Sequence, residues 1–192
     1  GLISLGCAKN RIDSELFLGV AKQYNIELTP SLADADIIVV NTCGFIGDAK
    51  QESIDMILSY CDLKEQGKIK EIYVMGCLSE RYRKELAEEI PEVDGYFGKF
   101  DHDKLLEALN KKYNTSLCNE RVLTTPNHYA YLKIAEGCNR ACSYCAIPII
   151  TGPYKSRTIE DIEDEVKYLV KNGVKEFQVI AQDLSFYGLD NY

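Results

Sequence analysis

Short apolar runs alternate with longer amphipathic stretches over about the first 115 residues of the chain. The apolar runs predict three strands, at 2–5, 37–40 and 72–75. Helical spacing of apolar residues predicts four helices, at about 11–23, 48–65, 79–89 and 102–112. The uninterrupted β-branched run at 37–40 is typical of a parallel strand that is covered on both faces. Strands separated by helices therefore predict an α/β fold with a doubly wound parallel sheet.

The ends and faces of these helices also follow from residue type. Asn10 and Ser79 are expected to cap the first and third helices, and Pro91 is expected to stop the third. In the second helix, Ile57 and Leu58 belong to the set of residues that we expect to face the core.

The pattern changes after residue 111, where Asn, Thr and Ser lead to a proline at position 126. This change predicts a first domain, a linker and a second domain at 1–115, 116–127 and 128–192. In the second domain, an extended run, a helix and a further strand are predicted at 129–135, 159–172 and 177–180. A closed β/α barrel needs roughly 200 residues or more. We therefore expect only the N-terminal part of a barrel, beginning with one strand–helix–strand unit.

The composition narrows the class of protein further. The chain has 22 Lys and Arg against 30 Asp and Glu, for a net charge of −8, and both halves are acidic. Because no apolar run approaches the ~18 residues of a membrane-spanning helix, and no basic half offers a footprint for phosphates, we expect neither membrane nor DNA as a partner. The sequence predicts a cytoplasmic protein. Its 8 cysteines are too few for a disulfide scaffold and more than packing requires.

Three of the cysteines form a compact motif, Cys138-x3-Cys142-x2-Cys145, just after the extended run. Zinc usually takes four ligands, commonly as two separated pairs, and no further Cys or His lies close by in the sequence. A loop with three thiolates leaves one iron of a four-iron cluster open to another ligand. A zinc site with a distant fourth ligand, or three reduced core cysteines, are the alternatives.

Three further cysteines, Cys7, Cys43 and Cys77, each follow a predicted strand and precede a predicted helix. They should therefore project from the carboxyl edge of the sheet, where ligands collect in open α/β folds. Nearby helix N-termini favour thiolates, and neighbouring glycines would leave room for a bulky inorganic centre. Buried packing cysteines are the alternative. Cys61, in mid-helix, and Cys118, in the linker, are not expected to be ligands.

The triplet at 138–145, with its Gly137-Cys138-Asn139 lead-in, Tyr144 and Pro148, resembles the radical S-adenosylmethionine (SAM) enzymes. The resemblance implies that Cys138, Cys142 and Cys145 hold a 4Fe-4S cluster whose open iron binds SAM. It also implies that Tyr144 lies against the adenine. In that superfamily, reductive cleavage of SAM yields a 5′-deoxyadenosyl radical, and an external electron donor supplies the electron.

With Cys7, Cys43 and Cys77, the chain resembles the radical-SAM methylthiotransferases, whose flavodoxin-like N-terminal domain holds an auxiliary 4Fe-4S cluster on three cysteines. The resemblance implies that these three residues are the ligands. One SAM molecule would methylate a sulfur on the auxiliary cluster, and a second would yield the radical that removes a β-hydrogen. The carbon radical would then take the methylthio group.

The contexts Ser4-Leu5-Gly6-Cys7-Ala8-Lys9-Asn10 and Asn41-Thr42-Cys43-Gly44 are similar to the branch of this family that modifies an aspartate of small-subunit ribosomal protein twelve. The implied partner is that protein or the ribosomal subunit. An acidic enzyme suits a basic ribosomal protein, although the same charge could serve solubility alone. A transfer-RNA methylthiotransferase and a non-catalytic iron–sulfur or zinc module are the alternatives. We expect the isolated fragment to be inactive, because most of the barrel wall is missing.

Other polar residues have weaker assignments. Arg157 and Gln182 lie where a barrel presents polar groups to cofactor or substrate, so Arg157 could pair with a carboxylate and Gln182 could hold SAM. The alternative for Arg157 is a solvated loop arginine. Asn10 could belong to the auxiliary pocket as well as cap its helix. His102 and His128 are expected to be structural, with no carboxylate constellation around them.

Overall fold

The computed structural model describes residues 1–29, 31, 34–109 and 121–191. Cys118, the first part of the predicted linker at 116–120 and the end of the predicted helix at 110–112 lie outside the described residues. The first half of the chain contains four strands and four α-helices in these residues. They are β1 (Leu2–Ser4), α1 (Ala8–Gln23), β2 (Ile37–Thr42), α2 (Gly47–Glu65), β3 (Glu71–Gly76), α3 (Cys77–Glu89), β4 (Gly95–Tyr96) and α4 (His102–Ala108).

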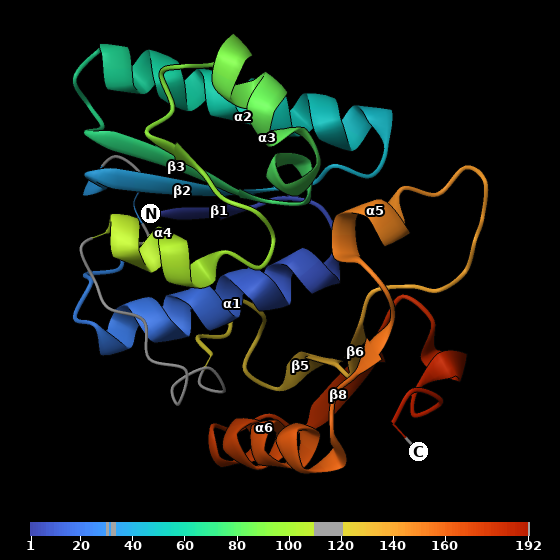
Figure 1. Ribbon diagram of the computed structural model, residues 1–192. Coiled ribbons are helices and arrows are strands. Elements are labelled where there is room, and N and C mark those ends of the chain that lie inside the picture. The colour runs from blue at the N-terminus through green and yellow to red at the C-terminus, as the bar shows by residue number, and fades with distance from the viewer. Residues whose placement is uncertain (30, 32–33, 110–120, 192) are drawn as a thin grey trace.

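The four strands form one parallel sheet in the order β1-β2-β3-β4. Helices α2 and α3 cover one face of the sheet, and α1 and α4 cover the other (Figure 1). Successive residues of β2 divide between the two cores, because side chains alternate along a strand. Ile38 and Val40 pack toward α2 and α3, and Val39 packs toward α1 and α4. This arrangement confirms the predicted α/β fold with a parallel sheet.

The second part of the chain forms the predicted strand–helix–strand unit with a more elaborate loop. Its elements are β5 (Tyr129–Lys133), β6 (Ala135–Glu136), α5 (Ile147–Thr151), β7 (Lys155–Ser156), α6 (Ile159–Lys171), β8 (Glu176–Ile180) and the 3-10 helix η3 (Leu184–Phe186). Strands β5 and β8 pair in parallel, and β6 pairs with β7 in the antiparallel sense. The two-residue strands β6 and β7 are too short to show a sequence pattern. The domain boundaries at 1–115, 116–127 and 128–192 stay predictions.

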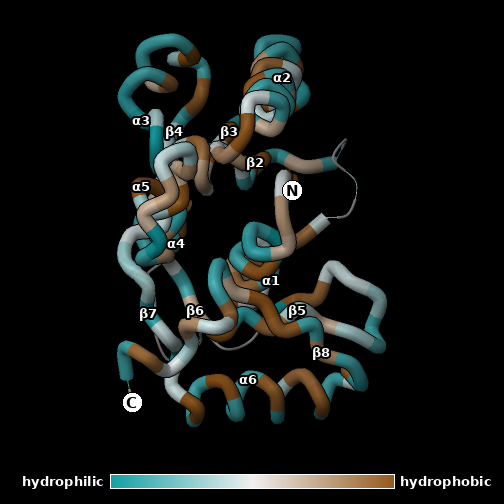
Figure 2. The backbone as a smooth tube through the Cα atoms, turned by 90° about the vertical axis from the view of Figure 1, so that its right-hand side faces the viewer, coloured by the Kyte–Doolittle hydropathy of each residue, from teal (hydrophilic) through white to brown (hydrophobic). Residues whose placement is uncertain are grey.

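Helix α1 lies in the middle of the molecule, between the parallel sheet and β5 (Figure 2). Helix α6 lies on the far side of β5 and β8, and alternates hydrophobic and hydrophilic residues along its length. The position of α1 explains why Asp13, Ser14 and Glu15 are buried along with its apolar residues. A helix enclosed on two sides buries more than one stripe of side chains.

The structure corrects three expectations about the helices. Asn10 does not cap α1, which begins at Ala8, because the Asn10 side chain is 1% exposed and bonds to neighbouring loops instead. Ser79 is no cap either, since α3 already begins at Cys77 and Ser79 is buried in its first turn. Leu58 is 45% exposed, because it lies about 100° around α2 from Ile57, which faces the sheet.

A buried arginine joins the two parts of the chain. The Arg121 side chain is 0% exposed, and its Nη1 lies 2.6 Å from Oε1 of Glu165 in α6. Its Nη2 lies 3.1 Å from Oε2 of Glu15 in α1 and donates a hydrogen bond to the Tyr131 carbonyl in β5. The other oxygen of Glu15 accepts hydrogen bonds from both the backbone N–H and the hydroxyl of Thr124. One side chain therefore ties α1, β5 and α6 together.

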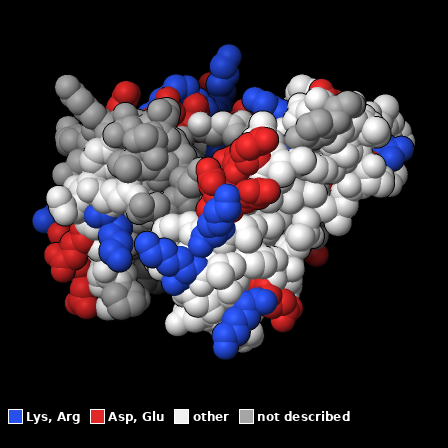
Figure 3. Space-filling view, turned by 90° about the horizontal axis from the view of Figure 1, so that it is seen from below, with Lys and Arg blue, Asp and Glu red and all other residues white. Residues whose placement is uncertain are grey.

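None of the helices that the structure describes combines the length and the apolar character needed to cross a bilayer. On the face shown in Figure 3, the basic side chains lie near acidic ones, and wide uncharged areas separate the groups. This face therefore presents mixed charge to its surroundings.

We expect Arg121→Met to lower the free energy of unfolding by about 3–5 kcal/mol, because it leaves the carboxylates of Glu15 and Glu165 buried without their shared partner. Chemical denaturation measures this change. Lys167→Met is the matched control: it removes an exposed pair with Glu163 and should cost less than about 1 kcal/mol. Equal, small losses for both variants would contradict the bridging role of Arg121.

Candidate functional site

The first cysteine triplet lies at the carboxyl edge of the parallel sheet, as predicted. Cys7 immediately precedes α1, Cys43 directly follows β2, and Cys77 is the first residue of α3. A Cβ placed on Gly6 would lie 2.7 Å from Cβ and 3.0 Å from Sγ of Cys43. A Cβ on Gly44 would lie 2.7 Å from the Cys77 carbonyl oxygen. The three strand ends are therefore packed directly against one another.

These contacts correct the role expected for the glycines. Hydrogens of Gly6, Gly44 and Gly76 face neighbouring side chains and backbone, so these glycines do not leave open space for an inorganic centre. Gly6 and Gly76 also have φ angles of 84° and 99°, which L side chains rarely adopt. Glycine is required here because it lets the cysteine-bearing loops approach closely.

Asn10 connects the three loops that carry this triplet. Its Nδ2 donates to the carbonyl oxygens of Leu5, at 3.1 Å, and Thr42, at 2.8 Å, just before Cys7 and Cys43. Its Oδ1 accepts a hydrogen bond from the Cys77 thiol, at a distance of 3.3 Å. Asn10 therefore contacts the loops of the first triplet, and its role in an auxiliary pocket stays a prediction.

The Cys77 thiol is held in its neutral form in the protein without metal. Burial raises the pKa of Cys77 to about 12, and the nearby Asp13, Cys43 and Cys7 add to this increase although Lys99 opposes it. A metal that binds here must displace the thiol proton.

The second triplet lies on the loop between β6 and α5. Its first residue, Cys138, donates its backbone N–H to the Gly152 carbonyl, and Cys145 donates its backbone N–H to the Cys142 carbonyl. Gly137 has a φ of 76°, and a Cβ there would lie 2.0 Å from the Pro153 carbonyl oxygen. The β6–β7 pair and this close approach bring the two ends of the cysteine loop together.

Arg140 and Asp183 tie this loop to the end of β8. Nε of Arg140 lies 2.7 Å from Oδ2 of Asp183, and the Arg140 backbone N–H donates to Sγ of Cys138 at 3.4 Å. Asp183 also caps η3 through its hydrogen bond from the backbone N–H of Ser185. No pattern in the sequence indicates the Arg140–Asp183 pair, because 43 residues separate its members.

The predicted SAM-binding residues differ in their surroundings. Tyr144 is 88% exposed on the cysteine loop, and Gln182 is half-buried between β8 and η3. The guanidinium of Arg157 donates to the Lys133 carbonyl and pairs with Asp161 and Glu165, so it meets carboxylates of its own chain. The SAM-binding roles of Tyr144, Arg157 and Gln182 stay predictions.

The two triplets are brought to the same side of the molecule. Helix α3, which begins at Cys77, contacts α5, which begins two residues after Cys145. In Figure 1, α5 lies beside the right-hand end of the sheet, where α1 and α2 begin. The structure thus places together six cysteines that are separated by up to 138 positions in the sequence.

The two triplets offer sulfur donors alone. Among the described residues, no three His, Cys, Asp or Glu side chains surround one ion-sized point. Each triplet nevertheless offers three thiols, the soft donors that select iron–sulfur clusters or zinc. Cys61, by contrast, is buried in α2 and packs in the core, as expected. The residues present fit a larger sulfur-ligated group at each triplet.

One residue that was expected to be isolated has charged neighbours. His102 lies at the start of α4, packs edge-on against Phe17, and lines a cavity of about 360 Å³ with Asp13, Lys99 and Lys133. Burial lowers the pKa of His102, although Asp13 acts in the opposite direction. The expectation that no carboxylate surrounds His102 was therefore wrong, because α1 brings Asp13 close to it.

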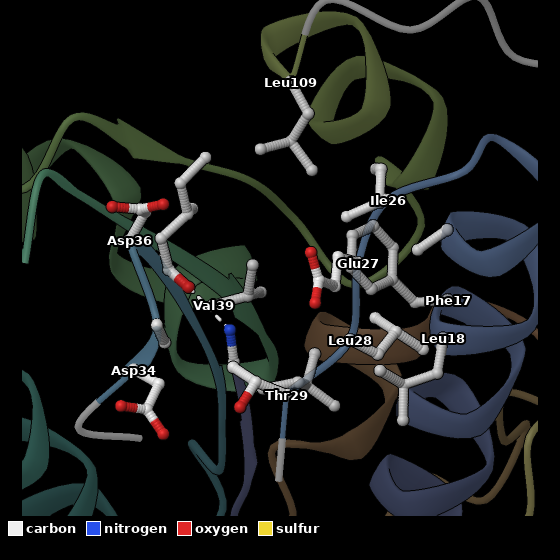
Figure 4. A pocket seen from close by; sticks show the side chains of 15 residues that line it. Phe17, Leu18, Ile26, Glu27, Leu28, Thr29, Asp34, Asp36, Val39 and Leu109 are labelled. Atoms are coloured by element: carbon white, nitrogen blue, oxygen red, sulfur yellow. Dashed lines mark hydrogen bonds between the residues drawn. The ribbon is translucent and has the colours of Figure 1, made fainter. Parts of the chain in front are cut away.

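Another cavity, of about 510 Å³, lies at the opposite end of β1 from Cys7. Figure 4 shows Phe17, Leu18 and Ile26 on one side of it and Asp34 and Asp36 on the other. No cysteine lines this cavity. It is therefore separate from the candidate site.

Comparison with known families agrees with this geometry. Residues 1–98 match uncharacterized protein family UPF0004, and residues 132–188 match the radical SAM superfamily. The chain belongs to family UPF0004, and a segment that matches the radical SAM superfamily follows it.

Individual relatives refine the comparison. The chain is 59% identical to the ribosomal protein uS12 methylthiotransferase RimO of Phocaeicola vulgatus, 58% identical to that of Bacteroides fragilis and 54% identical to that of Chlorobaculum tepidum. Each match covers 100% of this chain but only 44–45% of the relative. The chain thus spans less than half the length of these relatives.

We expect Gly6→Ala to reduce the iron bound at the first triplet, because the added Cβ would collide with Cys43. Gly67→Ala is the matched control, since Gly67 also has a positive φ, 71°, but faces open space. Both variants should lose about 1–2 kcal/mol of stability to backbone strain. Only Gly6→Ala should also lose iron in anaerobic reconstitution. Equal iron contents would contradict the packing of Gly6 on Cys43.

Proposed function

We propose that this chain forms part of a methylthiotransferase that uses SAM and two 4Fe-4S clusters to modify a ribosomal protein. One observation carries the proposal: two separate cysteine triplets, one on three strand ends and one on a single loop, lie on the same side of the fold. An enzyme that only cleaved SAM would need one triplet. The additional triplet, Cys7, Cys43 and Cys77, supports a sulfur-transfer role.

The residues of this chain divide between the two clusters. Cys7, Cys43 and Cys77 would hold the auxiliary cluster, and Asn10 would keep their three loops in register through its hydrogen bonds. Loss of the Cys77 thiol proton on ligation would free Oδ1 of Asn10 from its present donor. Asn10 would then orient the loops through its two Nδ2 bonds alone.

The second cluster would be held by a loop that is fixed at both ends. Cys138, Cys142 and Cys145 would be its ligands, and Arg140 would hold the loop against β8 through Asp183. Tyr144, whose ring is exposed beside Cys145, would offer a flat surface to the adenine of SAM. When bound, the reduced cluster and SAM supply a radical that abstracts hydrogen from an unactivated carbon, chemistry that no side chain provides at neutral pH.

The proposed substrate is the β-carbon of an aspartate in ribosomal protein uS12, presented alone or on the small ribosomal subunit. Relatives that are 54–59% identical carry the name ribosomal protein uS12 methylthiotransferase. A net charge of −8 also favours encounter with a basic protein over encounter with transfer RNA. The reaction further requires an external electron donor, and a ribosomal substrate implies a cytoplasmic location.

Iron and sulfide counting after anaerobic reconstitution tests the two-cluster arrangement. The parent chain should bind about eight irons, the sum for two four-iron clusters. The triple alanine variants of Cys7/Cys43/Cys77 and of Cys138/Cys142/Cys145 should each bind about four. A parent with about four irons, all lost with the second triplet, would remove the sulfur-transfer assignment. Cys61→Ala is the control and should bind as much iron as the parent.

Cys43→Ala, in a full-length enzyme that contains this chain, separates the two halves of the reaction. SAM cleavage should continue, because the second triplet is intact, while methylthiolation of uS12 should be abolished. Mass spectrometry of uS12 and chromatography of 5′-deoxyadenosine measure the two products. Persistent methylthiolated uS12 would show that the auxiliary site is misassigned. Thiolation of transfer RNA instead of uS12 by the parent would favour the transfer-RNA methylthiotransferase.

A further inference from the structure

Four charged side chains form a closed ring between the parallel sheet and the radical SAM segment. They are Asp13 in α1, Lys99 after β4, Lys133 in β5 and Glu136 in β6. Nζ of Lys99 lies 3.1 Å from Oδ2 of Asp13 and 2.9 Å from Oε1 of Glu136. Nζ of Lys133 lies 2.6 Å from Oδ1 of Asp13 and 2.6 Å from Oε2 of Glu136. Each carboxylate therefore uses one oxygen for each lysine.

The ring is buried between the two parts of the chain. The Lys99 side chain is 3% exposed, and the other three members are largely buried. Although burial opposes charge on Asp13, Lys133 and Lys99 outweigh it and lower the pKa of the carboxyl. Asp13 and Glu136 in turn overcome the effect of burial on Lys133 and raise its pKa. Asp13 and Lys133 are therefore a charged pair at neutral pH.

Short, rigid connections lead from the ring to both cysteine triplets. Asp13 lies one turn along α1 from Asn10, which contacts Cys77. The backbone N–H of Lys99 donates to Oε2 of Glu80, one turn into the helix that begins at Cys77. On the other side, Glu136 is followed by Gly137 and then by Cys138. The ring therefore lies between the ligands of the two sites.

Packing alone does not explain such a ring. Taking four charges out of water is costly, and well-packed apolar residues of similar size often stabilise a protein as much or more. Charge pairs, in contrast to apolar contacts, fix direction and register between the elements that carry them. Asp13 and Lys99 belong to the first part of the chain, and Lys133 and Glu136 belong to the second. Pairing all four side chains at once therefore allows one arrangement of the segments that carry them.

We propose that Lys99 is a positioning residue that sets the separation and orientation of the two cysteine triplets, through its simultaneous ion pairs with Asp13 and Glu136. This inference rests on the proposed function in one respect, namely that each cysteine triplet holds a cluster. The arrangement that Lys99 holds is a property of the polypeptide. Methylthio transfer needs the two sites at one fixed spacing, since a displacement of about 1 Å can cost about a hundredfold in rate.

The first test measures the arrangement itself in a full-length enzyme that contains this chain. Nitroxide labels are attached through a ketone-bearing amino acid at Glu52 in α2 and Lys167 in α6, two exposed sites on opposite sides of the ring. Lys99→Met and Lys99→Gln should shift or broaden the distribution of distances between the labels. Lys99→Arg, which keeps the charge, should restore the parent distribution.

Lys64→Met is the matched control, because Lys64 pairs with Asp94 inside the first sheet unit alone. It should leave the distribution of distances unchanged. Unchanged distributions in both neutral Lys99 variants would overturn the proposal. Should Lys99→Met fail to fold, Lys99→Gln, which keeps a polar group at this position, carries the test alone, and an unchanged distribution in that variant would overturn the proposal.

The second test separates positioning from packing. The ratio of methylthiolated uS12 to 5′-deoxyadenosine should fall by up to about a hundredfold in Lys99→Met, while SAM cleavage without substrate stays at the parent rate. A changed distance with a parent-like ratio would reduce Lys99 to a packing role and overturn the proposal. A parent enzyme that makes no methylthiolated product would instead refute the proposed function, and the label distances would still report on Lys99.

Discussion

Pairing of buried charges along α1 is the interaction on which the rest of the arrangement depends. This helix is enclosed by the sheet on one side and by β5 on the other, so Asp13 and Glu15 are buried away from bulk water. The burial of Asp13 and Glu15 is tolerated only because Lys99, Lys133 and Arg121 form ion pairs with their carboxylates. The two parts of the chain are consequently locked through charge pairs and not through an apolar interface alone.

The position of the two cysteine triplets relative to each other depends on these charge pairs. A parallel sheet gathers Cys7, Cys43 and Cys77 at its carboxyl edge without help from the second part of the chain. The second triplet is built just as locally, on a loop closed by the β6–β7 pair. Bringing the two triplets to one side of the molecule, however, requires α1 to hold β5 and β6 in place. Function in a two-site enzyme therefore depends on side chains that touch neither site.

Predictions from the sequence succeeded where a local pattern carried the information. The β-branched run of β2 identified a covered strand, and the position of each cysteine after a strand identified a common edge. The predictions failed where a side chain forms hydrogen bonds to a different strand or loop. Asn10 had the right residue type for a helix cap, but its amide bonds to the carbonyls of Leu5 and Thr42 instead. Leu58 fitted the apolar spacing of α2, yet it is exposed because it lies about 100° around the helix from Ile57, which faces the sheet.

The sequence by itself determined the chemistry of this protein: which thiols are available, how they are spaced, and which strands and helices carry them. Periods of 2 and 3.6 residues and turn residues record these features within a few positions. Only the tertiary structure decided that Lys99 meets Glu136 and that Arg121 meets both Glu15 and Glu165. Such pairs join residues 37, 106 and 44 positions apart, and a charged residue looks the same in a sequence whether water or a buried partner surrounds it.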